Sequence, residues 1–377
     1  MFRLTDHTPA ASGPARKGGK VPTAMERRRL HERLRLLCAT GAGLEAVAAP
    51  VSAIARDLIG AMSGSIFWLG NQGEAAGFYH DSAPVEMKDF FVSNFDALFS
   101  SPAEANMVGL IMAKGPPIGS YVDQADLQRL HASNVGKYLA GPLGHHYLLD
   151  VRIDLDGQGR ALLCLWNGQD RPFSPRDLAA MEPVRSQLCL AARPRAGNLH
   201  WRSADSRTRH LITDLTGERL FSIDPECEKV LLAGHLLGQS IPMAREMREA
   251  PGFCRQLAAM LARGEEARLH VPVANGRFEL TATTGQLRRP SDTGSYLFIA
   301  VDSQISLEVH AVEWLSSLPL TFLQKQIALH AMQGGKRADC EDRFGVSTEA
   351  LKKHLRTVYD RTGTSSWLEL REMFLGA

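Results

Sequence analysis

The feature that most constrains the fold lies near the carboxyl end, where one short helical segment has two chemically distinct faces. Over residues 348–361, three apolar side chains recur at helical spacing and must face a core. They are Leu351, Leu355 and Val358. Three cationic side chains fall on the opposite side and are expected to face solvent. They are Lys352, Lys353 and Arg356. The segment therefore predicts a helix that packs on one side and presents cations on the other.

The residues before this segment predict two further helices. Thr321 can cap a helix that ends at the two glycines 334–335, and a second helix is expected over about 337–344. Gly345 then makes a tight turn, and Ser347 caps the third helix. Two short helices joined by a glycine-containing turn form a helix-turn-helix.

Residues 320–370 resemble, without a gap, the DNA-binding domain of LuxR/GerE-type regulators. The matching pieces are Leu320-Thr321, Ile327, Gly334, Gly345-Val346-Ser347, Leu351 to Leu355, Val358-Tyr359 and "RTGTSSWLEL". The resemblance implies an all-α, four-helix domain over 315–377 that binds double-stranded DNA at an operator or promoter, with RNA polymerase as a possible partner. The helix after Ser347 would read the major groove, and the last helix, about 367–375, would form a homodimer contact. The expected DNA-binding residues are Lys336, Arg337, Ser347, Thr348, Lys352, Lys353 and Arg356.

Three positions depart from that family's pattern. Gln324 stands where the family has an acidic residue, and Ala350 removes a hydroxyl from the phosphate side. Glu341 stands where the family has alanine at a close helix crossing, so it could force the crossing wider. Gln324 and Glu341 favour an alternative, a signalling adaptor that binds protein through a degenerate helix-turn-helix.

Bulk composition gives no indication of a nucleic-acid partner. The 377 residues include 43 basic and 41 acidic side chains, for a net charge of +2, so any such partner must be recognised by a local cluster. With 44% hydrophobic residues, the chain can form two or three packed domains. No apolar run approaches the ~18 residues of a membrane span. Six scattered cysteines fit a reducing cytoplasm, and no tight Cys/His cluster indicates a metal or another cofactor.

The first large segment follows a mildly basic tail, residues 1–24, which we expect to be flexible. Residues 25–193 predict two helices, an apolar strand at 66–69, and a hairpin over 147–166 that turns at Asp156-Gly157. Ser174, Pro175 and Asp177 then form a helix start signal. This order, with the stretch "RPFSPRDLAAMEPVRSQL", resembles a GAF domain.

The second large segment covers residues 198–306. Asn275-Gly276 between alternating apolar runs predicts a hairpin whose two turn residues both have positive φ. Residues 296–301 are apolar on both faces and predict a central strand. The order of elements resembles a PAS domain, and the alternative is an α+β extension of the first segment. The expected fold is thus multidomain, with two α+β sensory domains followed by the all-α helix-turn-helix domain.

A small-molecule pocket is a further expectation for the first segment, although core packing explains the same residues equally well. The candidates are Phe67, Trp68, Tyr79, Tyr121, His145 and Trp166. His145 and His146 are adjacent at a strand start, so they point to opposite faces and cannot both enter one pocket. No nucleophile elbow or nucleotide-binding glycine loop is present, so the chain is not expected to be an enzyme. A thiol-redox enzyme that uses Cys164 or Cys189 is a remote alternative.

These patterns together predict a cytoplasmic, sequence-specific transcription regulator. The sensory domains would respond to a small molecule or a partner, and connecting helices near 174–193 and 305–318 would pass the change to the dimer geometry of the DNA-binding helices.

Overall fold

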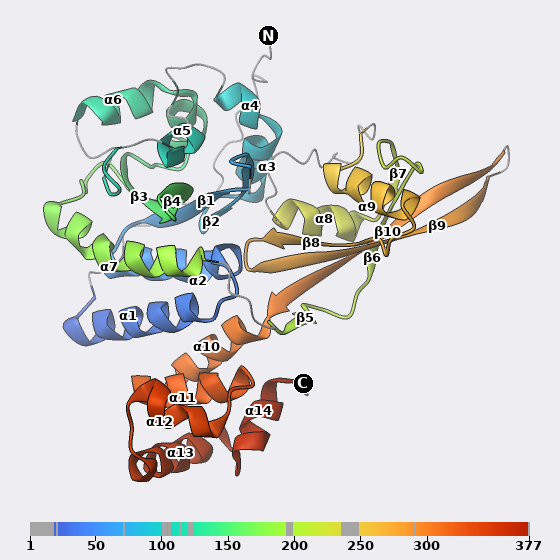
Figure 1. The fold of residues 1–377 in the computed structure, drawn as a ribbon. Coiled ribbons are helices and arrows are strands. Elements are labelled where there is room, and N and C mark those ends of the chain that lie inside the picture. Colours follow the sequence, from blue (N-terminus) through green and yellow to red (C-terminus); the bar gives the residue numbers. More distant parts are fainter. Residues whose placement is uncertain are drawn as a thin grey trace.

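The computed structural model describes residues 19, 22–70, 72–99, 104, 107–112, 115–119, 124–193, 199–234, 249–289 and 292–375. It contains two antiparallel sheets and a helical carboxyl-terminal region, which fits a mixed, multidomain α+β chain (Figure 1). The tail expected over residues 1–24 lies outside the described residues, except for Gly19 and residues 22–24.

The first sheet has four strands in the order β2-β1-β4-β3. The strands are β1 (Ser63–Leu69), β2 (Ala75–His80), β3 (Tyr147–Leu155) and β4 (Gln158–Asn167). All neighbours run antiparallel. The hairpin expected at Asp156-Gly157 is confirmed, and both turn residues have positive φ, at +51° and +80°.

Helices cover both faces of this sheet. The residues of β1 alternate between two apolar cores, with Ile66 on one face and Phe67 on the other. The Ile66 side is covered by α2 (Leu44–Ile59) and α7 (Pro175–Ala191), and α1 (Ala24–Ala39) packs on these two helices. The Phe67 side is covered by α3 (Val85–Ser93), α4 (Phe95–Leu98), α5 (Met107–Met112), α6 (Gln124–Ala132) and a π-helix (Gly136–Ala140) (Figure 1). The helix start expected at Ser174 is confirmed as a capping box with Asp177.

The second sheet projects to one side of the first (Figure 1). Its strand order is β7-β6-β10-β9-β8, and β5 also pairs with β10. The elements are β5 (Trp201–Ser203), β6 (Arg209–Thr213), β7 (Leu220–Ile223), α8 (Pro225–Ala233), α9 (Gly252–Ala262), β8 (Arg268–Val273), β9 (Gly276–Arg289) and β10 (Asp292–Ser306). The expected central strand is confirmed, because β10 contains residues 296–301 and pairs with both β6 and β9.

The hairpin expected at Asn275-Gly276 is present, but its turn lies one residue earlier. Val273 pairs with Gly276, so the turn residues are Ala274 and Asn275, of which Asn275 has φ +73°. Gly276 begins β9 and has no positive φ. A Cβ there would lie 2.0 Å from the Gln304 carbonyl oxygen. The glycine is thus required by the close approach of β10 and not by the turn.

The carboxyl-terminal region contains α10 (Leu307–Ser317), α11 (Phe322–Met332), a 3₁₀ turn (Arg337–Asp339), α12 (Cys340–Phe344), α13 (Thr348–Thr362) and α14 (Trp367–Leu375). The faces expected for α13 are confirmed, with the apolar stripe buried and the three cations exposed. The connector expected from residue 305 begins as a helix only at Leu307, because Ile305 still pairs with Arg202 of β5.

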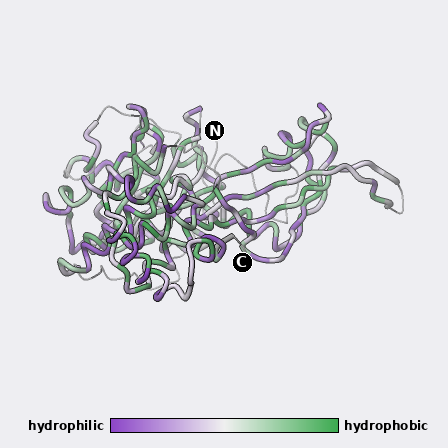
Figure 2. Tube along the Cα trace, turned by 60° about the horizontal axis from the view of Figure 1, so that its bottom comes forward, coloured by the Kyte–Doolittle hydropathy of each residue, from purple (hydrophilic) through white to green (hydrophobic). Residues whose placement is uncertain are grey.

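One apolar core joins the first sheet to the carboxyl-terminal helices. Helix α1 packs against α2 and α7 on one side and contacts α10 on the other. The core beneath α1 also contains Leu315 of α10, Ala331 of α11 and Leu370 of α14. Figure 2 shows apolar stretches running through the interior of the part formed by the first sheet, its helices and the carboxyl-terminal helices. Among the described residues, we find no helix with the length and apolarity needed to cross a membrane.

Candidate functional site

Helix α13, which carries the cationic side chains, lies at the end of the molecule remote from both sheets (Figure 1). Lys352 pairs with Glu349 one turn earlier, at 2.9 Å. The side chains of Lys353 and Arg356 are exposed and form no ion pair with any residue that the structure describes. This face is therefore open to a large anionic partner.

Arg337 joins this cationic face from the 3₁₀ turn. It lines a surface depression of about 370 Å³ together with Lys352, Arg356 and Tyr359. Lys336 is exposed beside it, and its carbonyl oxygen lies 3.3 Å from the His330 Nε2 atom. Of the expected DNA contacts, the structure thus groups Arg337, Lys352 and Arg356 around one hollow.

The two hydroxyl side chains at the start of α13 are already engaged. Ser347 Oγ accepts the Ala350 backbone N–H at 3.3 Å and caps the helix. Thr348 Oγ1 donates to a Glu341 carboxylate oxygen at 3.0 Å. Glu341 is half-buried and points to the beginning of α13, while its neighbour Cys340 fills the small core between α11 and α13. A negative charge thus lies beside Thr348, one of the residues expected to contact DNA.

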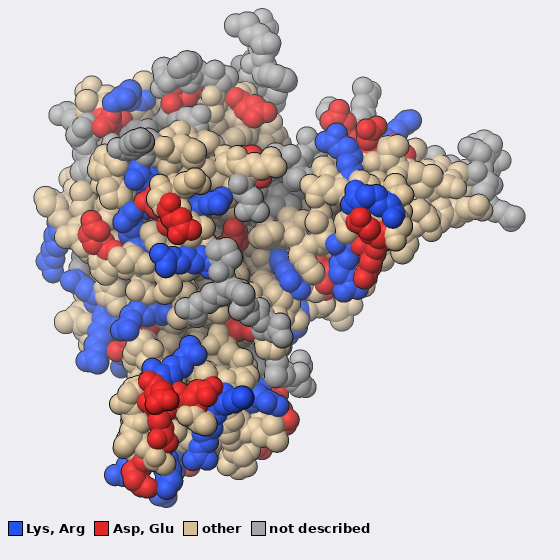
Figure 3. Space-filling model, in the orientation of Figure 1, with Lys and Arg blue, Asp and Glu red and all other residues tan. Residues whose placement is uncertain are grey.

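Gln324, the second departure from the family pattern, has a local structural role. Its side-chain oxygen accepts the Thr321 N–H at 2.8 Å, and its own N–H donates to Thr321 Oγ1 at 3.4 Å. This capping box fixes the start of α11 without an acidic residue. Figure 3 shows basic and acidic side chains interleaved on the carboxyl-terminal helices. Residues 315–377 carry nine Lys and Arg against seven Asp and Glu.

A second candidate site is a cavity of about 70 Å³ on the Phe67 side of the first sheet. Of the expected pocket residues, Phe67, His145 and Trp166 line it. Trp68 and Tyr79 lie on the opposite face, in the core beneath α1, because alternate residues of a strand point to opposite sides. The single pocket expected from these aromatic residues is corrected accordingly. Tyr121 lies outside the described residues.

His145 is fixed at one end of this cavity. Its Nε2 atom lies 2.8 Å from Ser63 Oγ. Its ring stacks on Trp166, with centroids 5.0 Å apart, and on His80, with centroids 5.4 Å apart. His146 points elsewhere and contacts His131, with ring centroids 4.4 Å apart. The structure therefore brings one histidine of the pair into the cavity.

Burial keeps both cavity histidines neutral. It lowers the pKa of His80 to about 4, an effect that nearby Asp81 opposes and Lys88 reinforces. Burial and the neighbouring His80 hold the pKa of His145 well below its ordinary value.

These shifts predict a loss of stability in mild acid. Above pH 6.5 His80 is neutral in both the folded and the unfolded chain, so it adds no pH dependence. As the pH falls from 6.5 towards 4, the unfolded chain binds a proton that the folded chain does not, and the free energy of unfolding falls. Between pH 7 and 5 we expect His80 alone to contribute a loss of about 2 kcal/mol, measured by urea unfolding.

The matched variants are His80→Gln and, as a control, His210→Gln on the exposed side of β6. The first should lose less stability on acidification than the wild type, and the second should follow the wild type. An unchanged pH dependence in His80→Gln would contradict the assignment.

Several lining residues were not recognised from the sequence. They are Phe78, His80, Met87, Lys88, Phe91 and Leu139. Phe78 and His80 alternate along β2, so a correct strand assignment would have found them. The π-helix was not expected, and it depends on Gly136, where a Cβ would lie 2.1 Å from the Leu130 carbonyl oxygen. Such π-turns are frequent at functional sites.

The cysteines named for a redox alternative are separated by the first sheet. Cys164 belongs to the Phe67 side, whereas Cys189 packs against the core beneath α1. Burial raises the pKa of the Cys164 thiol, and Asp150 raises it further, so this thiol stays protonated. The two residues cannot act as an attacking and a resolving thiol. Among the described residues, no group of three or more metal-ligating side chains is present.

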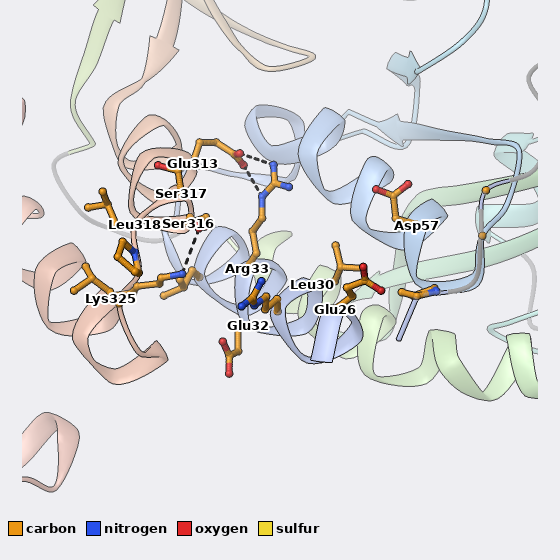
Figure 4. A pocket seen from close by; sticks show the side chains of 17 residues that line it. Glu26, Leu30, Glu32, Arg33, Asp57, Glu313, Ser316, Ser317, Leu318 and Lys325 are labelled. Carbon is orange, nitrogen blue, oxygen red and sulfur yellow. Dashed lines mark hydrogen bonds and ion pairs between the residues drawn. The ribbon is translucent and has the colours of Figure 1, made fainter. Parts of the chain in front are cut away.

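A third feature is a groove of about 950 Å³ between α1 and the α10–α11 junction. Figure 4 shows Arg33 reaching from α1 to Glu313 of α10, where Nε lies 3.2 Å from a carboxylate oxygen. Nearby, the Arg35 guanidinium lies 4.6 Å from the centroid of the Phe322 ring. These contacts hold the carboxyl-terminal helices against α1.

Comparisons with known proteins do not identify a family. No protein-family model matches the chain, and no curated protein matches it. A solved structure that is similar in part is a chain of the crystal structure of the E. coli DhaR(N)-DhaL complex. The match has 9% identity and a TM-score of 0.25, and it covers 76% of this chain and 94% of that chain. At this TM-score the likeness establishes neither a common fold nor a function.

Proposed function

We propose that the chain is a cytoplasmic transcription regulator that binds double-stranded DNA as a homodimer through α13. The observation that carries this proposal is the pair of faces on α13. Its apolar stripe is buried against α11 and α12, and Lys352, Lys353 and Arg356 are exposed on an open surface. Long cationic side chains on a protruding helix suit a major groove, where they neutralise phosphates and reach base edges.

The rest of the chain would control when this helix is presented. We propose a GAF-like domain over 25–193 and a PAS-like domain over 198–306 as the sensory part, with the DNA-binding domain over 315–377. Two recognition helices must lie about 34 Å apart to enter successive major grooves, so a change in dimer geometry would gate binding. RNA polymerase is a further possible partner, and no catalytic role is proposed.

The packing of α1 supports a route for that control. Helix α1 contacts α7, which packs on the first sheet, and α10, which directly precedes the proposed DNA-binding helices in the chain. The Arg33–Glu313 pair and the shared core couple these elements. A shift of α1 against the first sheet would therefore move α10 as well.

Selection of bound fragments from genomic DNA, with and without cell metabolites, tests this proposal. We expect enrichment of fragments that share a sequence, and a change of enrichment when the effector is present. A protein that enriches no shared sequence in either condition would contradict the proposal.

Glu341→Gln is expected to bind DNA more tightly than the wild type. The change removes a negative charge from the start of α13 and leaves an amide that can still accept the Thr348 hydroxyl. We expect a gain of a few-fold at low salt, where charge effects are strongest. Mobility-shift titration measures it, and Glu182→Gln, at an exposed position of α7, is the control. Weaker DNA binding by Glu341→Gln would show that the Glu341 carboxylate does not repel the DNA.

The same acidic position favours a second candidate, a signalling adaptor that binds protein. The Glu341–Thr348 contact and the near-balance of charges over 315–377 would suit a protein partner with both signs of charge. This candidate predicts no sequence enrichment in the selection experiment. It also predicts that replacing the cationic side chains of α13 does not change how DNA binding depends on salt.

A further inference from the structure

We propose that the cavity beneath α3 binds a small monocarboxylate, with its carboxylate against Lys88 and His80 and its hydrocarbon part among phenylalanine, leucine and methionine side chains. The inference rests on the proposed function in one respect, that this acid is the effector that controls DNA binding.

Lys88 supplies a cation that forms no direct ion pair with a described residue. It lies on α3, lines the cavity and is half-buried, yet it forms no hydrogen bond or ion pair with any part of the chain that the structure describes. The nearby carboxylate of Asp81 is already bound by Arg56, at 2.6 Å. Burial lowers the pKa of Lys88, while Asp81 and Asp89 oppose that shift. A partly desolvated ammonium group is stabilised when an anion binds next to it.

His80 supplies a neutral hydrogen-bond donor. Its Nδ1 atom accepts the backbone N–H groups of Ser82 at 3.2 Å and Ala83 at 3.1 Å. A neutral ring whose Nδ1 accepts must carry its proton on Nε2. This Nε2–H makes no hydrogen bond with a residue in the described part of the chain, and His80 lines the cavity. It is therefore available to a carboxylate oxygen.

Two further polar groups around the cavity are engaged within the protein. His145 Nε2 lies within hydrogen-bond distance of Ser63 Oγ, and Ser65 Oγ accepts the Trp166 Nε1–H at 3.4 Å. The remaining wall is apolar. It includes Phe67, Phe78, Met87, Phe91, Leu139 and Leu143. One cation and one donor beside an apolar wall match a single carboxylate on a short hydrocarbon chain, and they do not match a dicarboxylate or an amine.

The cavity size limits the ligand. An apolar cavity of about 150 Å³ is sufficient for benzene. The cavity here has about 70 Å³, so by the same proportion it accommodates about three carbon atoms. Butyrate has a three-carbon chain beyond its carboxylate, which would lie at the cavity edge against Lys88 and His80, and we choose it as the probe.

The test is calorimetric titration of the full-length protein, without DNA, with sodium butyrate, 1-butanol and butylammonium chloride. We expect the wild type to bind butyrate at least tenfold more tightly than either analogue. Lys88→Met should bind butyrate at least tenfold more weakly than the wild type, and Lys88→Arg should recover part of the affinity. The control is Lys137→Met, because Lys137 is exposed on the π-helix of the same layer and does not line the cavity.

Two results would overturn the inference. One is equal binding of butyrate and 1-butanol, or no binding of either, by the wild type. The other is undiminished butyrate binding by a folded Lys88→Met protein. A loss of butyrate binding in both Lys88→Arg and the control Lys137→Met would also overturn it, because the loss would then not be specific to the cavity. Since DNA is absent, a failure of operator binding leaves this test unaffected. If butyrate binds but leaves operator binding unchanged, the cavity is a carboxylate site, and its proposed role as the effector site is wrong.

Discussion

The triple variant Lys352→Ala, Lys353→Ala, Arg356→Ala is expected to lose specific DNA binding altogether. Each side chain that reads a base edge contributes about 1–3 kcal/mol to specificity, and three such losses exceed a hundredfold in affinity. The helix itself should persist, because alanine favours helix and the buried stripe of Leu351, Leu355 and Val358 is untouched. Mobility-shift titration against a selected fragment measures the loss.

Single variants and salt dependence make this prediction more specific. Lys352→Ala and Arg356→Ala should each weaken binding, and the wild-type affinity should fall steeply with salt because phosphate contacts release counterions. Arg361→Ala, exposed at the carboxyl end of the same helix, is the control. If Lys352→Ala and Arg356→Ala both titrate like the wild type, α13 is not the recognition helix. A flat salt response would favour the adaptor.

Leu37→Ala on α1 is expected to destabilise both the first sheet layer and the carboxyl-terminal helices. Leu37 has no exposed surface and belongs to the core that also contains Leu315 and Leu370. Truncating a fully buried leucine costs about 2–5 kcal/mol, because apolar surface is lost and a cavity remains. Urea unfolding measures the total cost, and Met25→Ala, at an exposed site on α1, should cost far less.

Hydrogen exchange gives a second measurement for the same variant. If α1 couples the first sheet to the carboxyl-terminal helices, amide protection should fall in α10 and α11 as well as in α2 and α7. A loss confined to α2 and α7 would show that the carboxyl-terminal helices are stable without α1.

Local patterns in the sequence correctly predicted many individual elements. The capping box at Ser174, the helix start at Thr321, the Asp156-Gly157 turn and the two faces of α13 each depend on residues within a few positions of one another. Such features are encoded locally, so they can be recognised without knowing what packs against them. The turn predicted at Asn275-Gly276 was wrong by one residue, because Gly276 is required by the close approach of β10 and not by the turn.

Features that depend on distant residues could not be predicted. The candidate pocket wrongly combined Phe67 with Trp68 and Tyr79, although alternation along the strand predicted at 66–69 already separates Phe67 from Trp68. Which face of the sheet holds a cavity depends on the helices packed against it. The contributions of Lys88 and His80 depend on α3 lying over the sheet. The Glu341–Thr348 contact depends on the angle between α12 and α13.

The sequence by itself determined a carboxyl-terminal helix-turn-helix with a cationic outer face, because helical periodicity separates apolar and charged residues within one short segment. Only the tertiary structure decided that this segment shares a core with α1, and that a cavity with one lysine and one neutral histidine lies under α3. Both depend on contacts between residues far apart in the chain, which local periodicity does not encode.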